Sequence, residues 1–204
     1  MNNYKIELDE ANHIYTVNGI AKSSVTQILK AEGIINDSYY QEWNRDLGIA
    51  VHKACEYWDN GTLDIESIDD VTKKRLNNWK QFMSFYPQSK ILHNEEKLYC
   101  KQYDYCGTLD RCMKIITGDI RRDGIILIDI KTCQAVPKWA GLQLMAYKLA
   151  FESMFNLKIK ERWVVQLRED TYKVIPYANG IGDKRDWLSI VNTFNLKKRM
   201  GIYG

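Results

Sequence analysis

The stretch GIILIDIKT, residues 124–132, constrains the fold most, because it places two charges in a segment typical of a buried strand. Its run of consecutive aliphatic residues predicts a strand covered on both faces. Asp129 and Lys131 follow at positions i and i+2, so their side chains leave the strand from the same face. Uncompensated burial of a charge costs several kcal/mol. The two groups must therefore form a structural ion pair or hold something else.

The composition fits a single globular domain covering residues 1–204. Its 29 basic and 26 acidic residues give a formal charge of +3, which excludes a polybasic tail as the main feature but permits a basic groove around an acidic centre. The first residues resemble no secretory signal, and no apolar run approaches the length of a membrane span. The five cysteines are odd in number and lack C-x-x-C spacing, which predicts reduced thiols. We expect a cytoplasmic protein of a bacterial cell, encoded by a phage.

The apolar periodicity predicts an α/β or α+β fold, with helices packed on a central mixed β-sheet. The predicted strands are residues 4–8, 13–17, 90–100, 105–115, 124–131, 162–169 and 172–177. The predicted helices are residues 23–33, 38–60, 70–86, 137–155 and 183–199. A capping box of Ser24 and Gln27 opens the first helix, and Pro137 opens the fourth. We divide the domain into an N-terminal hairpin with helices (1–90), a core (91–155) and a C-terminal hairpin with a helix (156–204).

A second acid lies on the strand that precedes Asp129. The segment YCGTLDRC places Asp110 three residues after Gly107, and if the two strands are neighbours, Asp110 stands beside Asp129. Two carboxylates and the main-chain carbonyl of Ile130 would form a hard, all-oxygen site, which Mg²⁺ or Mn²⁺ prefers over Zn²⁺. Lys131, on the same face, would reach a water at this site and offset developing phosphate charge.

Two predicted helices add polar side chains to this group. Gly48, His52 and Glu56 share one flank of the second helix, and Gln143 and Tyr147 are spaced i and i+4 on the fourth. Each has a plainer interpretation, since His52 could be a core or surface histidine and the other pair could be helix surface and core. The order of the motifs along the chain favours the functional interpretation.

These motifs carry a family resemblance. GTLD, DIK and QLMAY, with a helical histidine upstream, resemble the PD-(D/E)XK nuclease superfamily and its RecB-like branch. SSVTQIL is also similar to a segment of phage exonucleases and of the mitochondrial genome maintenance exonuclease. The resemblance covers residues 12–150 in order and implies a restriction-endonuclease-like core.

The resemblance also implies a role for each residue. The implied metal ligands are His52, Asp110, Asp129 and the carbonyl of Ile130; Lys131 is the implied catalytic lysine, and Gln143 and Tyr147 are implied to orient it and the substrate phosphate. The family often has a glutamate on the preceding strand, where the register favours Glu95 over Glu96.

The implied function is that of a metal-dependent DNA exonuclease in replication, recombination or repair, using Mg²⁺ or Mn²⁺. DNA is the implied partner, with a helicase, a single-strand-binding protein or a recombination protein beside it. Relatives in this branch that hold an iron–sulfur cluster have three cysteines after the Q-x-x-x-Y helix, and this sequence has none beyond Cys133, so we expect no cluster. The sequence also has no G-x-x-x-x-G-K-[ST] loop, so we expect no nucleotide cofactor. The alternatives are a structure- or sequence-specific endonuclease, in defence or junction cleavage, and a non-catalytic DNA-binding protein that keeps the fold.

Overall fold

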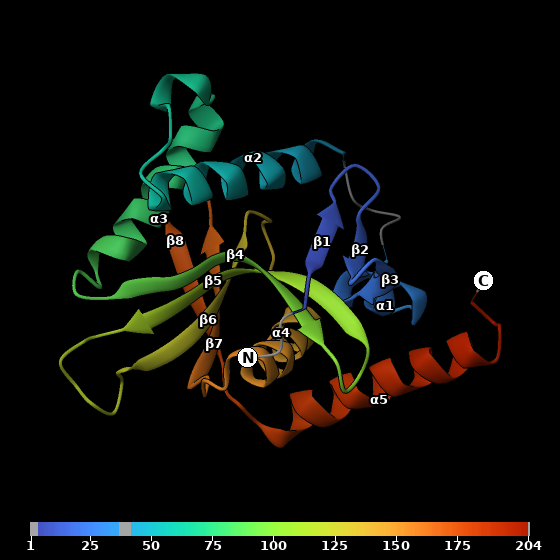
Figure 1. Ribbon diagram of the computed structural model, residues 1–204. Coiled ribbons are helices and arrows are strands. Elements are labelled where there is room, and N and C mark those ends of the chain that lie inside the picture. The colour runs from blue at the N-terminus through green and yellow to red at the C-terminus, as the bar shows by residue number, and fades with distance from the viewer. Residues whose placement is uncertain (1–3, 37–41, 204) are drawn as a thin grey trace.

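The computed structural model describes residues 4–36 and 42–203, and they form an α/β fold around a mixed sheet of eight strands (Figure 1). The strands are β1 (Ile6–Asp9), β2 (Ile14–Val17), β3 (Ile20–Ser24), β4 (Lys90–Cys100), β5 (Tyr105–Ile115), β6 (Gly124–Lys131), β7 (Glu161–Leu167) and β8 (Tyr172–Tyr177). The helices are α1 (Val25–Ala31), α2 (Glu42–Asp59), the 3-10 helix η2 (Ile65–Ser67), α3 (Asp70–Ser84), α4 (Ala140–Phe155) and α5 (Ile181–Arg199). The predicted fold class, a mixed sheet flanked by helices, is confirmed.

Helices cover both faces of the central strands (Figure 1). The apolar sides of α2 and α3 pack on one face around Trp79 and Phe82, and α1, α4 and α5 pack on the other around Phe151 and Trp187. The strand β6 serves both cores, since Ile128 enters the first and Leu127 the second. This double burial explains its continuous aliphatic sequence.

The strand β5 shares one of its edges between two partners. β4 pairs along nearly its whole length, so β3 and β6 must pair on the opposite edge. There β3 pairs in parallel with residues 105 and 106, and β6 pairs antiparallel with residues 111–115. No strand of the described chain takes residues 107–110 on this edge. The sheet therefore forks at the segment GTLD, and we call this place the fork.

Several elements differ from the prediction. Neither β3 nor η2 was predicted, although Asn18 and Gly19, with φ of 50° and 79°, form the tight turn typical of a hairpin that leads into β3. The helix α4 begins at Ala140 rather than at Pro137, because a turn in which the Ala140 N–H donates to the Pro137 carbonyl (3.0 Å) precedes it. The predicted helix 38–60 is observed as α2, and residues 38–41 lie outside the described residues.

None of the helices in the described ranges is both long and apolar enough to span a membrane.

Replacing Ser24 should destabilise the protein, since Ser24 ends β3 and caps α1. Its Oγ accepts from the Gln27 N–H (3.2 Å) and its N–H donates to Gln27 Oε1 (2.8 Å). We expect Ser24→Ala to lower the free energy of unfolding by about 1 kcal/mol in urea denaturation. Ser189→Ala is the control, because this exposed hydroxyl donates only within α5 and its loss should change stability by less than about 0.5 kcal/mol. Equal effects would contradict the capping role.

Candidate active site

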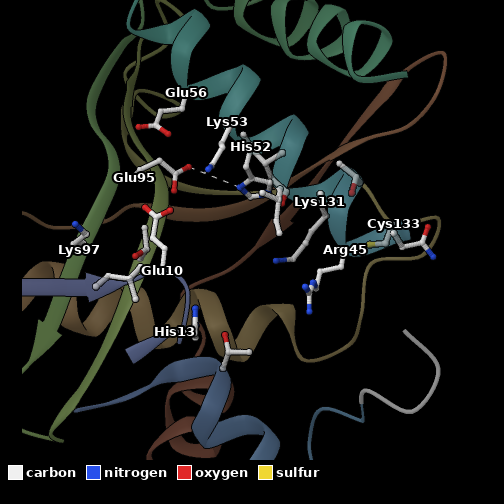
Figure 2. Close-up of a pocket in the computed structure, with 18 of the residues that line it drawn as sticks. Glu10, His13, Arg45, His52, Lys53, Glu56, Glu95, Lys97, Lys131 and Cys133 are labelled. Atoms are coloured by element: carbon white, nitrogen blue, oxygen red, sulfur yellow. Dashed lines mark hydrogen bonds and ion pairs between the residues drawn. The ribbon is translucent and has the colours of Figure 1, made fainter. Parts of the chain in front are cut away.

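A pocket of about 660 Å³ opens above the fork (Figure 2). One wall is α2 with Arg45, His52 and Lys53, and the facing wall is the β1–β2 hairpin with His13. The middle parts of β4 and β5 and the end of β6 form its floor. In Figure 2, Glu56 and Glu95 gather at one end while Arg45 and Lys131 lie at the other. Lys53 and Lys97 lie on the same side as these acids, so the pocket presents both acidic and basic groups.

Asp110 holds the fork open. Beyond the last pair of the ladder, Arg111 with Ile128, the two strands separate and the Ile130 N–H loses a main-chain partner on β5. The Asp110 carboxylate replaces it, since Oδ2 accepts from the Ile130 N–H at 2.6 Å. A buried N–H needs such a partner. This bond fixes the side chain of Asp110, a residue that is only 8% exposed, against Ile130, which lines the pocket.

His52 directs its Nδ1 toward two acids. Its Nε2 lies 2.9 Å from the Ile130 carbonyl, which can only accept, so Nε2 carries a proton, and in the neutral imidazole Nδ1 keeps its lone pair. Nδ1 is 3.6 Å from Asp110 Oδ2 and 4.0 Å from Glu95 Oε1. These gaps are too long for hydrogen bonds. A lone pair that faces two carboxylates at such distances is an arrangement suited to a cation.

Glu95 completes a group of three ligand atoms. One ligand atom each from His52, Glu95 and Asp110 lies within 4.8 Å of the other two. The β4–β5 ladder pairs residues 94 with 111 and 96 with 109, and between these pairs Glu95 adopts a left-handed φ of 48°. Such a conformation is uncommon for glutamate and clusters at functional sites. Burial and the neighbouring Asp110 raise the pKa of Glu95 to about 8, against the opposing effect of Arg111.

Asp129 and Lys131 form an ion pair, and Gln143 of α4 bonds to the same lysine. Lys131 Nζ donates to Asp129 Oδ1 (2.9 Å) and to Gln143 Oε1 (3.1 Å), and Gln143 Nε2 donates to the Tyr147 hydroxyl (3.1 Å). Burial raises the pKa of Asp129 to about 6, opposed by Lys131. Burial lowers the pKa of Lys131, but Asp129 and Asp110 outweigh it, so this pKa is raised. The lysine is therefore a positioned cation at the floor of the pocket.

Two of the sequence motifs meet in a direct packing contact. A Cβ placed on Gly107 would lie 2.5 Å from Cε1 of Tyr147, so the ring occupies the space that any other side chain at this position would need. The glycine of GTLD thereby allows the tyrosine of QLMAY to reach Gln143. This contact gives the glycine a physical role that its spacing alone does not reveal.

The structure brings the predicted site residues into one place with two differences of detail. The group of three ligand atoms contains Glu95, whereas Asp129 is bonded to Lys131. The Ile130 carbonyl, predicted to bind metal, accepts from His52. Glu96, the other candidate on β4, bonds to His93 instead, with its Oε2 2.8 Å from Nδ1.

Two residues in or beside the site were missed from the sequence. His13 lines the pocket from the hairpin, and its left-handed φ of 53° has no signature in the sequence. Arg111 lies buried behind Glu95 and Asp110. The sequence did contain a signal for Arg111, because an arginine in an apolar strand needs a compensating partner, as Asp129 and Lys131 do.

The residues present fit a divalent cation. The group of three offers two carboxylates and one imidazole, a donor set that suits a divalent cation and differs from the all-oxygen site expected from the sequence. Asp129 adds a carboxylate beside this group, and its Oδ2 is ion-paired with Lys131 Nζ at 2.8 Å.

Comparison with known proteins gives distant structural likeness only. No family model and no curated protein matches the chain. A solved protein from Eubacterium rectale, described as a "putative exonuclease", is similar with a TM-score of 0.48 at 9% identity, over 89% of this chain and 76% of that one. A second structure, described as SSO0001, has a TM-score of 0.36 at 16% identity, over 86% and 85% of the two chains. Both TM-scores are below 0.5 and both identities are low.

The metal-free protein should lose stability as the pH rises through the pKa values of its buried acids. Folding raises the pKa of Asp129 from 3.8 to about 6 and that of Glu95 from 4.5 to about 8. Between those limits the native state binds more protons than the unfolded chain, so the free energy of unfolding falls with rising pH. Urea denaturation in EDTA should show this decline, and Glu95→Gln should remove the part of it that occurs between about pH 6 and pH 8. A slope that Glu95→Gln leaves unchanged would contradict the assignment.

Gly107→Ala should destabilise the protein through the Tyr147 ring. The added methyl group overpacks a buried contact, and we expect a loss of about 1–3 kcal/mol in the free energy of unfolding. The double variant Gly107→Ala with Tyr147→Leu should lose less than the sum of its single changes. Gly48→Ala is a control of opposite sign, since its Cβ would meet Thr132 Oγ1 at an ordinary 3.6 Å and alanine favours the helix. Similar losses at both glycines would refute the steric explanation.

Proposed function

We propose that this protein is a metal-dependent DNA exonuclease of the PD-(D/E)XK superfamily, of the RecB-like type. One observation supports it above all. His52 from α2, Glu95 from β4 and Asp110 from β5 converge on one pocket, and Lys131, held by Asp129 and Gln143, lies at its floor. His52 Nδ1 faces Asp110 Oδ2 at 3.6 Å and Glu95 Oε1 at 4.0 Å in an open pocket, an arrangement that suits a bound cation.

The side chains have separate tasks in phosphodiester hydrolysis. His52, Glu95, Asp110 and Asp129 would hold the divalent cation, which supplies positive charge to the phosphoryl oxygens when bound. Lys131 would position the attacking water and offset the negative charge that develops on the phosphate. Gln143 accepts from Lys131 (3.1 Å) and so keeps its ammonium directed toward the pocket.

The pocket also offers contacts for the DNA backbone. Arg45 and Lys53 are exposed on the wall formed by α2 and would bind phosphates on either side of the acidic group, since such contacts position a nucleic acid without reading its sequence. The hairpin closes the opposite side, which favours a strand end over an uninterrupted duplex. We expect a role in replication, recombination or repair, beside a helicase, a single-strand-binding protein or a recombination protein.

A nuclease assay tests this proposal. The substrates are end-labelled single-stranded DNA, linear duplex and covalently closed circular DNA, each with Mg²⁺, Mn²⁺ or EDTA. We expect degradation of linear DNA only with metal, sparing of circles, and a loss of at least about 100-fold in rate for Lys131→Ala. Gel analysis of the labelled products measures all three.

Lys148→Ala is the matched control. This lysine lies on α4 and pairs with Glu152 (2.6 Å) outside the pocket, so its removal should leave the rate close to that of the wild type. Cutting of closed circles would identify an endonuclease instead. DNA binding without cleavage under any metal would mean that the protein keeps the site as a scaffold, and the proposed chemistry would be wrong.

A further inference from the structure

Arg111 is a fully buried guanidinium that bonds to two acids from different elements. Its Nε donates to Asp59 Oδ2 (2.6 Å), and its Nη1 donates to Glu95 Oε1 (2.9 Å) and to the Asp110 carbonyl (2.6 Å). The side chain has 0% exposure and its guanidinium faces the Trp79 ring, 5.7 Å from the ring centroid. A charge buried this deeply is tolerated only because acids pair with it.

The partners of Arg111 belong to the three elements that supply the group of ligands. Asp59 is the last residue of α2, the helix that carries His52. Glu95 is on β4, and Arg111 itself follows Asp110 on β5. The Arg111 guanidinium therefore connects all three elements that supply the group of ligands.

Both acids occupy positions that local structure disfavours. Asp59 puts a carboxylate at the negative end of a helix, where the helix dipole opposes it, and Trp79 Nε1 together with Arg111 compensates. Glu95 has a left-handed backbone, which needs support from its surroundings. Arg111 provides a charged partner at both positions.

We propose that Arg111 is a positioning residue for the cation site, one that sets the carboxylate of Glu95 and the end of α2 so that His52, Glu95 and Asp110 converge before a cation binds. This inference rests on the proposed function, because it assumes that the group of three binds a divalent cation. Glu95 Oε1, which accepts from Arg111, is also the oxygen 4.0 Å from His52 Nδ1. A carboxylate oxygen has two lone pairs, so it can accept from Arg111 and still bind metal. Partners behind metal ligands act in this way, and their replacement weakens metal binding about 10–100-fold.

Arg111→Lys tests the inference, because lysine keeps the charge but lacks the planar guanidinium that donates to two acids at once. We expect calorimetric titration with Mn²⁺ alone, without DNA, to show binding at least about tenfold weaker than in the wild type. In a Glu95→Gln background, Arg111→Lys should have little further effect on Mn²⁺ affinity, because the residue through which it acts is already changed.

Arg162→Lys is the matched control. Arg162 is also fully buried, but it lies across the sheet and bonds to the Gly141 carbonyl (2.6 Å) and to Asp183 (2.7 Å). Both variants should lower the melting temperature measured in EDTA, yet only Arg111→Lys should lose Mn²⁺ affinity. Should Arg111→Lys fail to fold, Asp59→Asn carries the test, with a smaller loss of affinity expected in the same direction.

The outcomes separate this inference from the proposed function. Wild-type affinity for Mn²⁺ in Arg111→Lys, or in Asp59→Asn where that variant carries the test, would show that the network is structural only and overturn the role of Arg111. Equal losses in Arg111→Lys and Arg162→Lys would do the same. A wild-type protein that binds no Mn²⁺ would refute the metal-dependent function itself, and the role of Arg111 with it.

Discussion

The organisation of the site depends on one constraint, which is that two strands share a single edge of β5. A strand has two hydrogen-bonding edges, and β4 uses one of them almost entirely. β3 and β6 divide the other, and the main-chain groups between them need partners from side chains. Asp110 supplies one through its bond to the Ile130 N–H. The separation of the strands also creates the concavity in which functional groups can meet a ligand.

Charge at the centre of the sheet is arranged as compensated pairs on the two sides of the fork. On one side Lys131 neutralises Asp129. On the other, Arg111 lies between Asp59 and Glu95. Each pair satisfies part of a buried acid and leaves lone pairs toward the pocket, so the protein tolerates a high density of carboxylates in an apolar layer. The negative charge of these carboxylates would stabilise a bound cation.

The sequence predicted the fold class, most elements and the order of the motifs, because those depend on local periodicity and spacing. The grouping of Glu95 with His52 and Asp110 depends in addition on the detailed backbone geometry of β4. A register shift between Ile91 and His93 and a left-handed residue set the direction of the Glu95 side chain, and neither has a local signature. The strand β3 is short and polar, and it is held as a strand by pairing with β2 in a hairpin and with β5 at its end. The bonding partner of Asp129 likewise follows from three-dimensional packing.

The contact between Gly107 and Tyr147 has a consequence for the evolution of such chains. A mutation of the glycine alone meets the ring, and a mutation of the tyrosine alone leaves a void beside a backbone with no side chain to fill it. Each single step is therefore disfavoured, and natural variation should change the two positions together or not at all. In a set of homologues, covariation between them would be a record of this packing contact, independent of any selection on catalysis.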